Sequence, residues 1–379
     1  MRSVMATKAA LPRRIMTTLS PSRLSFAARR PAWAGFDWLL HTLAAAAGMV
    51  AVLMLAALVG VLLVSALPSI RMFGASFLVD SQWRPNEMQV PMHGPNGKVL
   101  RDADGEIVTR TIPPTFGALP VIYGTTVSST FSLLLAVPLS LGAAVFLIRI
   151  APRRLGIPVS FLIEFLAAIP SIAYGIWALF VLVPFLQHHL EPALIGWLGK
   201  TSGFGWMFRQ TVHIGHRTFV LPVAATGRDM LSGSMVLAIM IIPIITAIAR
   251  DVLRQVPLSQ LEGTVALGAT WWQSSREMLY FARGGIFGAV MLGLARAAGE
   301  TMAITMVIGN NNQIVFSLLA PAQTMSSLLA TEFSEASLDI HRAALCEVAL
   351  VLLAMSLAFN VVARRLVVGK NPIRAGAAF

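Results

Sequence analysis

The sequence predicts an all-α integral membrane protein with six transmembrane helices. Two compositional observations lead to that prediction: hydrophobic residues make up 56% of the chain and charged residues only 12%. The third observation is that the apolar segments are continuous, without the alternation of polar and apolar residues that is typical of a membrane β-barrel. Because lipid offers no hydrogen bonds to the backbone, such runs are expected to cross a bilayer as helices.

Basic residues flank the apolar runs, and their positions predict the orientation of the chain. The formal net charge is +12, with seven Lys/Arg against one acid in residues 1–37 and four Lys/Arg without an acid in residues 364–379. Lys and Arg collect on the cytoplasmic side of membrane proteins, so both termini are expected in the cytoplasm. Because this charge follows the ends of the spans, membrane lipid is an expected partner and nucleic acid is not.

The N-terminal part is expected to begin with a basic cytoplasmic tail at 1–37, followed by a first transmembrane helix at 38–67. Residues 68–118 are polar and are expected to form a periplasmic loop. Within it, residues 102–105 have the sequence Asp-Ala-Asp-Gly, a turn that predicts a small hairpin over 99–112.

Five further helices are expected, and arginines near their ends mark the cytoplasmic turns. The third span contains Pro170, which frees a backbone carbonyl and predicts a kink. Ser171 and Tyr174 follow this proline, and they either satisfy the freed backbone or face a polar path. The five helices are expected at 119–148, 159–186, 230–249, 284–308 and 343–363. The outside connections and the C-terminal tail are expected at 187–229, 309–342 and 369–379.

The cytoplasmic connection 256–283 has the pattern of two short helices. Ser259 and Glu262 fit a capping box, so a helix is expected to begin near Ser259. Gly268 can end that helix and allow a second one, which carries Trp271 and Trp272. Exposed aromatic residues on a cytoplasmic helix pair indicate that the pair either lies on the membrane or is covered by a partner protein. The residues alone leave both possibilities open.

Two charges stand inside the apolar run 284–308. Arg296 lies near its middle, where an arginine costs roughly 2.5–3.5 kcal/mol on insertion scales, so something must compensate its charge. Glu300 follows four residues later on the same helix face, and the two side chains can form an internal ion pair. The alternative is an external anion, because a guanidinium presents a planar fork to two phosphate oxygens. In that case Glu300 would hold Arg296 extended, and Thr301 would add a hydroxyl.

Motifs for catalysis or nucleotide binding are absent from the sequence. Gly97 and Lys98 are followed by Val99, so they do not form a phosphate-binding loop. The sequence also contains no nucleophile elbow and no zinc-protease helix. We therefore expect no catalytic residues, no metal site and no cofactor in this chain itself.

Four segments resemble the permeases of phosphate importers of the PstC type, a family of ABC transporter subunits. These segments are FGALPVIYGTTVSS at 116–129, AIMIIPIITAIARDVL at 238–253, LGLARAAGETMAITMVIGN at 292–310 and TMSSLLATEFSEA at 324–336. The segment around Pro170 is also similar. Glu262-Gly263-Thr264 with Gly268 resembles the EAA loop of ABC-importer permeases, which docks on an ATPase subunit, with Gly-Thr standing where Ala-Ala is usual.

The resemblance covers about 116–368 and implies the type I ABC-importer permease fold over 119–368, in the bacterial cytoplasmic (inner) membrane. It implies a heterodimer with a related permease of the PstA type, two cytoplasmic ATPase subunits that bind ATP, and an external phosphate-binding protein. Phosphate would then cross the membrane by alternating access. The candidate coupling-loop residues are Ser259, Glu262 and Gly268. The candidate substrate-path residues are Arg296, Glu300, Thr301, Ser171 and Tyr174.

Other functions stay open on the residues alone. An ABC permease for a different oxyanion would share these features. A secondary transporter would couple ions through intramembrane carboxylates, with Glu164, Glu300 and Glu347 as candidates. A non-transporting membrane scaffold would use Arg296 and Glu300 only as an internal pair. Whether uptake requires a co-expressed ATPase separates an ABC permease from a secondary transporter.

Overall fold

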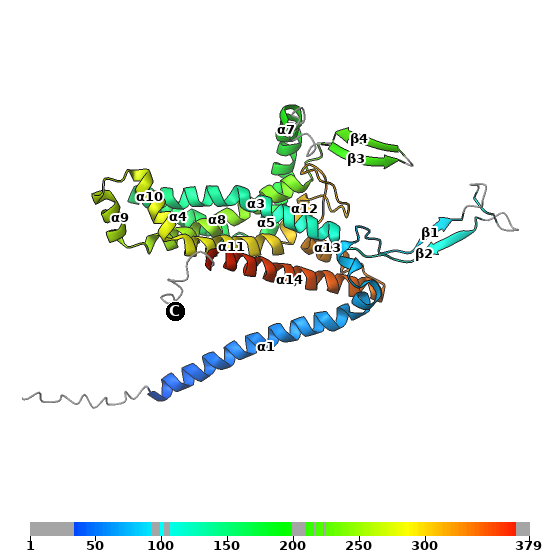
Figure 1. Cartoon of the computed structure of the whole chain (residues 1–379), viewed down its shortest axis with the longest axis horizontal. Coiled ribbons are helices and arrows are strands. Elements are labelled where there is room, and N and C mark those ends of the chain that lie inside the picture. Colours follow the sequence, from blue (N-terminus) through cyan, green and yellow to red (C-terminus); the bar gives the residue numbers. More distant parts are fainter. Residues whose placement is uncertain are drawn as a thin grey trace, which may run out of the picture. The chain divides into compact units, whose positions relative to one another are not determined.

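Helices dominate the computed structural model of the chain (Figure 1). It describes residues 34–92, 99–101, 107–198, 209–214, 217–222 and 225–368. The predicted turn at 102–105, the predicted tail at 369–379 and residues 1–33 of the predicted N-terminal tail lie outside the described residues. The chain divides into two compact units, Met1–Ala57 and Leu58–Phe379. All sites discussed below lie in the second unit.

Five helical segments of the described chain are long and apolar enough to cross a membrane, or up to six if one bent pair counts as a span. The predicted all-α membrane fold is therefore confirmed. The five segments are Trp38–Phe73, Leu119–Ile150, Ser171–Trp197, Met230–Arg254 and Asp339–Val362. The bent pair consists of Trp271–Phe281 and Arg283–Gly299, which meet at 69°.

Four of the predicted spans each correspond to one helical segment, which is longer than predicted. The prediction at 38–67 corresponds to α1 (Ala34–Phe73), and that at 230–249 to α8 (Met230–Arg254). The prediction at 119–148 corresponds to α3 (Leu119–Val145), which a π-helical turn, η1 (Phe146–Ile150), prolongs. The prediction at 343–363 corresponds to α14 (Asp339–Val368).

The predicted helix 159–186 is wrong as a single element, because the chain breaks at Ile169 and Pro170. α4 (Arg153–Ala168) ends there, and both break residues adopt extended backbone with ψ of 132° and 138°. A proline disfavours the helical conformation of the residue before it and supplies no N–H, so the kink predicted at Pro170 is a complete break.

Beyond the break, helical structure continues much further than predicted. α5 (Ser171–Trp177) is followed by η2 (Ala178–Leu182), α6 (Val183–Phe185), η3 (Leu186–Leu190) and α7 (Glu191–Leu198). The prediction of an outside loop from residue 187 is therefore wrong. The polar residues of 187–191 suggested a loop, but the apolar residues on either side of them continue the span.

The helix predicted at 284–308 is also divided. α11 (Arg283–Gly299) ends at Glu300, whose backbone is extended with φ of −69° and ψ of 128°, and α12 (Met302–Val307) follows. The prediction of a single helix is therefore wrong: the apolar pattern continues, but the chain turns at Glu300, whose carbonyl accepts a hydrogen bond from another segment, described below.

Short strands and helices lie in the segments predicted as outside connections. β1 (Met88–Pro91) pairs antiparallel with β2 (Thr109–Ile112). An antiparallel bridge between Arg101 and Ile107 encloses the predicted turn. β3 (Arg209–Ile214) pairs with β4 (Arg217–Pro222), and two further helices are α2 (Ser76–Val79) and α13 (Met325–Glu332).

Within the second unit, α3 packs on α8, α11 and α13. Ala136 of α3 belongs to the same buried apolar cluster as Ile241 of α8 and Ala289 of α11. At the outer end of α3 the contact with the α13 segment is between backbones. A Cβ added at Gly124 would lie 2.0 Å from the carbonyl oxygen of Gln323, so only glycine fits there. Beside it, the Met325 N–H donates to Thr125 Oγ1 at 2.9 Å.

Candidate functional site

Arg296 lies in the last turn of α11, and its side chain is exposed. Within the described residues, its guanidinium makes no hydrogen bond and no ion pair. The internal pair with Glu300 that the sequence allowed is therefore not formed. The helix turns away at Glu300, so the two residues do not share the face that continuous helical geometry would give them.

Glu300 is 8% exposed and uses its polar groups to stabilise the break between α11 and α12. Its side-chain Oε1 accepts a hydrogen bond from the Ala303 N–H at 3.5 Å. Its backbone carbonyl accepts a hydrogen bond from Ser326 Oγ at 2.7 Å, a contact that comes from α13. Glu300 is thus built into the backbone turn, while Arg296 stays available to an outside partner.

Thr301, Ser171 and Tyr174 lie on the elements that meet at this break. Thr301 is the residue before α12, and its hydroxyl donates to the Gly299 carbonyl at 3.3 Å. α12 packs on α5, the helix that carries Ser171 and Tyr174. Their close approach depends on Gly175, where an added Cβ would lie 3.0 Å from Ala303 Cα. The structure therefore places the predicted substrate-path residues on three neighbouring helices.

Tyr174 satisfies the backbone at the Pro170 break. Its hydroxyl donates to the Leu166 carbonyl at 2.8 Å. In a continuous helix the N–H of residue 170 would donate to that oxygen, but proline has none. Of the two roles that the sequence left open for Tyr174, backbone satisfaction is thus the one seen in the structure.

The predicted cytoplasmic helix pair is present as α9 (Leu258–Ala266) and α10 (Trp271–Phe281). Gly268 lies between them with a φ of +82°, a left-handed conformation that favours glycine. The predicted capping box at Ser259 is wrong, since α9 begins after Pro257 without a side-chain cap. The capping box of this region belongs to Thr270 and Gln273, at the start of α10.

α9 has no buried residue, and the helix pair carries a set of exposed apolar side chains. Ser259 and Glu262 are exposed on the same helix. Leu267, in the turn, is 90% exposed. An apolar group of this size on a polar connection indicates a surface that another molecule covers. The exposed apolar residues of the pair are Leu258, Val265, Leu267, Trp271, Trp272, Tyr280 and Phe281.

Sequence reasoning missed a pair of carboxyl groups, Glu191 and Asp229, that are fully buried. Glu191 Oε2 accepts a hydrogen bond from the Gly227 N–H at 3.2 Å, and Asp229 Oδ1 accepts one from Ser232 N at 2.8 Å. Among the described residues, no other group donates to Glu191 Oε1 or Asp229 Oδ2, and the two carboxyl groups interact with each other. The pattern Asp229-x-x-Ser232 could have identified the helix cap, but the pairing depends on residues 38 positions apart in the sequence.

Burial, together with the charge of Glu191, raises the pKa of Asp229 to about 7. An unfolded aspartate titrates near pH 4, so the buried group stabilises the fold fully below about pH 4, and this stabilisation is lost as the pH rises to about 7. We expect Asp229→Asn, whose amide oxygen can still cap α8, to remove this loss. The variant should unfold at a higher temperature than the wild type at pH 8, with a smaller difference at pH 5.

Thermal unfolding of the purified protein in detergent at both pH values would measure this effect. Glu335→Gln, which removes an exposed carboxylate, is the matched control and is expected to leave the pH dependence unchanged. The raised pKa of Asp229 would be contradicted if the difference in melting temperature between Asp229→Asn and the wild type were the same at pH 5 and at pH 8.

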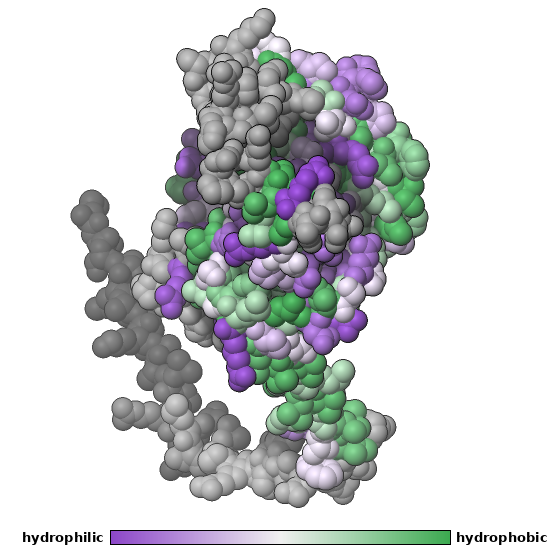
Figure 2. Space-filling view, turned by 90° about the vertical axis from the view of Figure 1, so that its right-hand side faces the viewer, coloured by the Kyte–Doolittle hydropathy of each residue, from purple (hydrophilic) through white to green (hydrophobic). Residues whose placement is uncertain are grey.

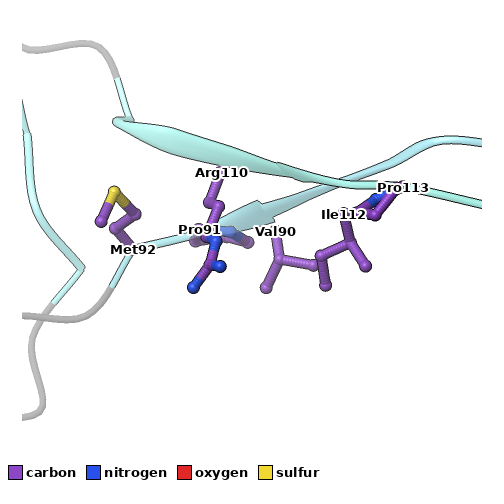
Figure 3. Close-up of a pocket in the computed structure, with 6 residues that line it drawn as sticks. All are labelled: Val90, Pro91, Met92, Arg110, Ile112 and Pro113. Carbon is purple, nitrogen blue, oxygen red and sulfur yellow. The ribbon is translucent and has the colours of Figure 1, made fainter.

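A separate cavity of about 490 Å³ lies on the β1–β2 hairpin (Figure 3). Its lining is mostly apolar, with one arginine, and it contains none of the predicted site residues. The lining residues are Val90, Pro91, Met92, Arg110, Ile112 and Pro113. Figure 2 shows hydrophobic patches beside separate polar groups on the described surface, as a chain that meets both lipid and water requires.

Comparison with known proteins gives close relatives of one kind, although no family model matches the chain. The phosphate transport system permease protein PstC of Mesorhizobium japonicum is 36% identical over 86% of this chain and 89% of its own length. The PstC protein of Haemophilus influenzae is 37% identical over 83% of this chain and 88% of its own length. PstC 1 of Mycobacterium tuberculosis is 33% identical over 80% of this chain and 85% of its own length.

Among solved structures, the chain is similar to a chain of the inward-facing MetNI methionine ABC transporter. The identity is 17%, and the match covers 65% of this chain and 93% of that one with a TM-score of 0.43.

Proposed function

The chain belongs to the PstC family of phosphate transport system permease proteins, and from that membership we propose that it is the membrane-spanning permease subunit of an ATP-driven importer. The importer translocates inorganic phosphate across the bacterial cytoplasmic membrane by alternating access. The chain is a multi-pass membrane protein whose relatives are permease subunits, and it supplies the path for the substrate. A partner ATPase subunit binds and hydrolyses the ATP.

One observation carries the substrate assignment: Arg296 is exposed at the break between α11 and α12 and makes no hydrogen bond or ion pair within the described residues. A guanidinium inside a membrane domain requires a counter-charge, and Glu300 is engaged by the backbone of α12. Phosphate fits the planar fork of Arg296 and can accept several hydrogen bonds at once. The same ion must leave again, so a single arginine is better suited than a closed cage of ligands.

The steps assigned to this chain follow from these positions. Phosphate released from an external binding protein meets Arg296, with the Thr301 and Ser171 hydroxyls on the neighbouring helix ends. Glu300 stabilises the break that presents Arg296, and Tyr174 stabilises the second break at Pro170. Because both breaks interrupt spans near the same place, the halves of the spans can tilt and expose Arg296 to one side of the membrane at a time.

The assembly proposed for this permease has three kinds of partner. A related permease of the PstA type completes the substrate path as a heterodimer, and an external phosphate-binding protein delivers the anion. There are two cytoplasmic ATPase subunits, one of which covers the exposed apolar side chains of α9 and α10. Ser259, Glu262 and Gly268 belong to the loop that docks there.

The test is co-purification of the tagged chain with its ATPase and partner permease, followed by uptake of radioactive phosphate into proteoliposomes. We expect uptake only with ATP on the ATPase side and with binding protein on the other side. Uptake that is driven by an ion gradient without ATP would make the chain a secondary transporter. ATP-driven uptake of another oxyanion in preference to phosphate would overturn the substrate assignment.

A further inference from the structure

A chain of hydrogen bonds joins α9 to the end of α3. Thr264 of α9 and Ser274 of α10 place their hydroxyl oxygens 3.1 Å apart, ten residues from each other in the sequence. Ser274 Oγ also accepts a hydrogen bond from Arg149 Nη2 at 3.3 Å. Arg149 lies in η1, the turn that prolongs α3. Ser274 is therefore the centre of a link between three elements, and it is fully buried.

Ser274 is the acceptor in both contacts of this link. A hydroxyl oxygen has two lone pairs. Ser274 Oγ accepts from Thr264 Oγ1 at 3.1 Å and from the charged Arg149 Nη2 at 3.3 Å. The Thr264 hydroxyl also lies 2.7 Å from the Leu261 carbonyl, to which it donates within α9. Hydrogen bonds from a charged donor are stronger than hydrogen bonds between neutral groups, so the contact of Arg149 with Ser274 is the stronger of the two.

Outside this link, α9 is held only weakly in the described part of the chain. The apolar cluster under the helix pair includes Met278 of α10 together with Ala144 and Ile148 of α3 and η1, but α9 contributes only the half-buried Leu261. α10 is thus packed on the spans, whereas α9 depends on Leu261, the Gly268 turn and the Thr264–Ser274 contact. Since α9 is the more exposed helix, a force on the pair from a covering protein would act largely on it.

The other end of α3 reaches the Arg296 site. Thr125 accepts the Met325 N–H, and the next residue, Ser326, donates to the Glu300 carbonyl. Thr125 and Arg149 are separated by 24 residues, or roughly 36 Å of helix. In Figure 1, α9 and α10 lie at one end of α3 and α13 lies toward the other. One helix therefore contacts both the cytoplasmic pair and the segment that stabilises the α11–α12 break.

We propose that Ser274 is a positioning residue that fixes α9 to α3 through Thr264 and Arg149, so that movement of α9 is passed along α3 to the segment that holds Glu300. This inference rests on the proposed function for the identity of the molecule that moves α9. The other half of the proposal, that Ser274 holds α9 in place, does not depend on any partner.

Two measurements on Ser274→Ala test the two parts. Hydrogen exchange of the purified full-length chain in detergent should show the amides of α9 exchanging about threefold to tenfold faster, as expected for the loss of one hydrogen bond. In the reconstituted importer, the phosphate taken up per ATP hydrolysed should fall by a similar factor of about three to ten, while ATP hydrolysis continues.

The chain offers matched controls. Ser275 is the neighbouring buried serine, but its hydroxyl donates only within its own helix, to the Trp271 carbonyl. Ser275→Ala is therefore expected to match the wild type in both measurements. At Thr264, Val removes the hydroxyl with nearly the same shape and should reproduce Ser274→Ala, whereas Ser keeps the hydroxyl and should behave as the wild type.

Each outcome has a distinct meaning. Wild-type exchange in α9 of Ser274→Ala would overturn the positional link. Faster exchange with an unchanged ratio of phosphate to ATP would overturn the role in transmission. If the wild-type complex does not transport phosphate, the proposed function fails, and hydrogen exchange still decides whether Ser274 holds α9.

Discussion

Replacing Arg296 with Gln is expected to abolish phosphate uptake while the complex still assembles. Each hydrogen bond to a charged group contributes about 1.5–3 kcal/mol, so loss of the two-pronged contact lowers uptake by on the order of 100-fold or more. Assembly should persist because, within the described residues, the Arg296 side chain makes no hydrogen bond or ion pair that supports the fold. Uptake of radioactive phosphate into proteoliposomes and the subunit ratio of the purified complex measure the two effects.

Two variants control this experiment. Arg296→Lys keeps the charge but not the fork, so it should retain intermediate uptake. Arg71→Gln removes an arginine at the end of α1, far along the chain from α11 and α12, and should transport normally. Wild-type uptake by Arg296→Gln would remove Arg296 from the substrate path, and loss of the complex would make it a structural residue.

Gly268→Pro is expected to separate ATP hydrolysis from transport. Gly268 has a φ of +82°, and its N–H donates to the Val265 carbonyl at 2.9 Å. Proline fixes φ near −65° and has no N–H, so the turn between α9 and α10 cannot form. With α9 turned away from α10, the phosphate taken up per ATP hydrolysed should fall by about tenfold or more, since a proline in an unsuitable position costs about 3 kcal/mol.

Gly268→Asn is the corresponding control, because asparagine adopts the left-handed conformation more readily than other residues with a side chain. A Cβ at this position meets no other atom within 4 Å, so the added side chain has space. It should retain most of the coupling. If the proline variant transports as much phosphate per ATP as the wild type, α9 does not transmit the force.

The elements that could be predicted from the sequence are those whose cause is local. Long apolar runs predicted α1, α3, α8 and α14, and Pro170 predicted a kink where the structure has a complete break, because a missing N–H acts at its own position. Gly268 gave the turn between α9 and α10. The capping box was assigned to Ser259, although Thr270 and Gln273 have the same spacing and form it in the structure.

The features that could not be predicted depend on residues distant in the sequence. The apolar run 284–308 contains no proline, yet α11 ends at Glu300, whose carbonyl accepts a hydrogen bond from Ser326 of a later segment. The turn at Glu300 removes this residue from the helix face that would have placed it beside Arg296. The burial of Asp229 against Glu191 likewise arises only when α8 meets the long third span.

The contact of Gly124 and Thr125 with the α13 segment has a consequence for biosynthesis. Met325 follows Thr125 by 200 residues, so α3 leaves the ribosome long before the segment that covers it. Until then, Gly124 lacks the backbone of Gln323 against which it packs, and the Thr125 hydroxyl lacks the Met325 N–H from which it accepts a hydrogen bond in the finished chain. The outer end of α3 is therefore completed only after residues 323–325 have been inserted, and a chain truncated before α13 lacks the Thr125–Met325 contact.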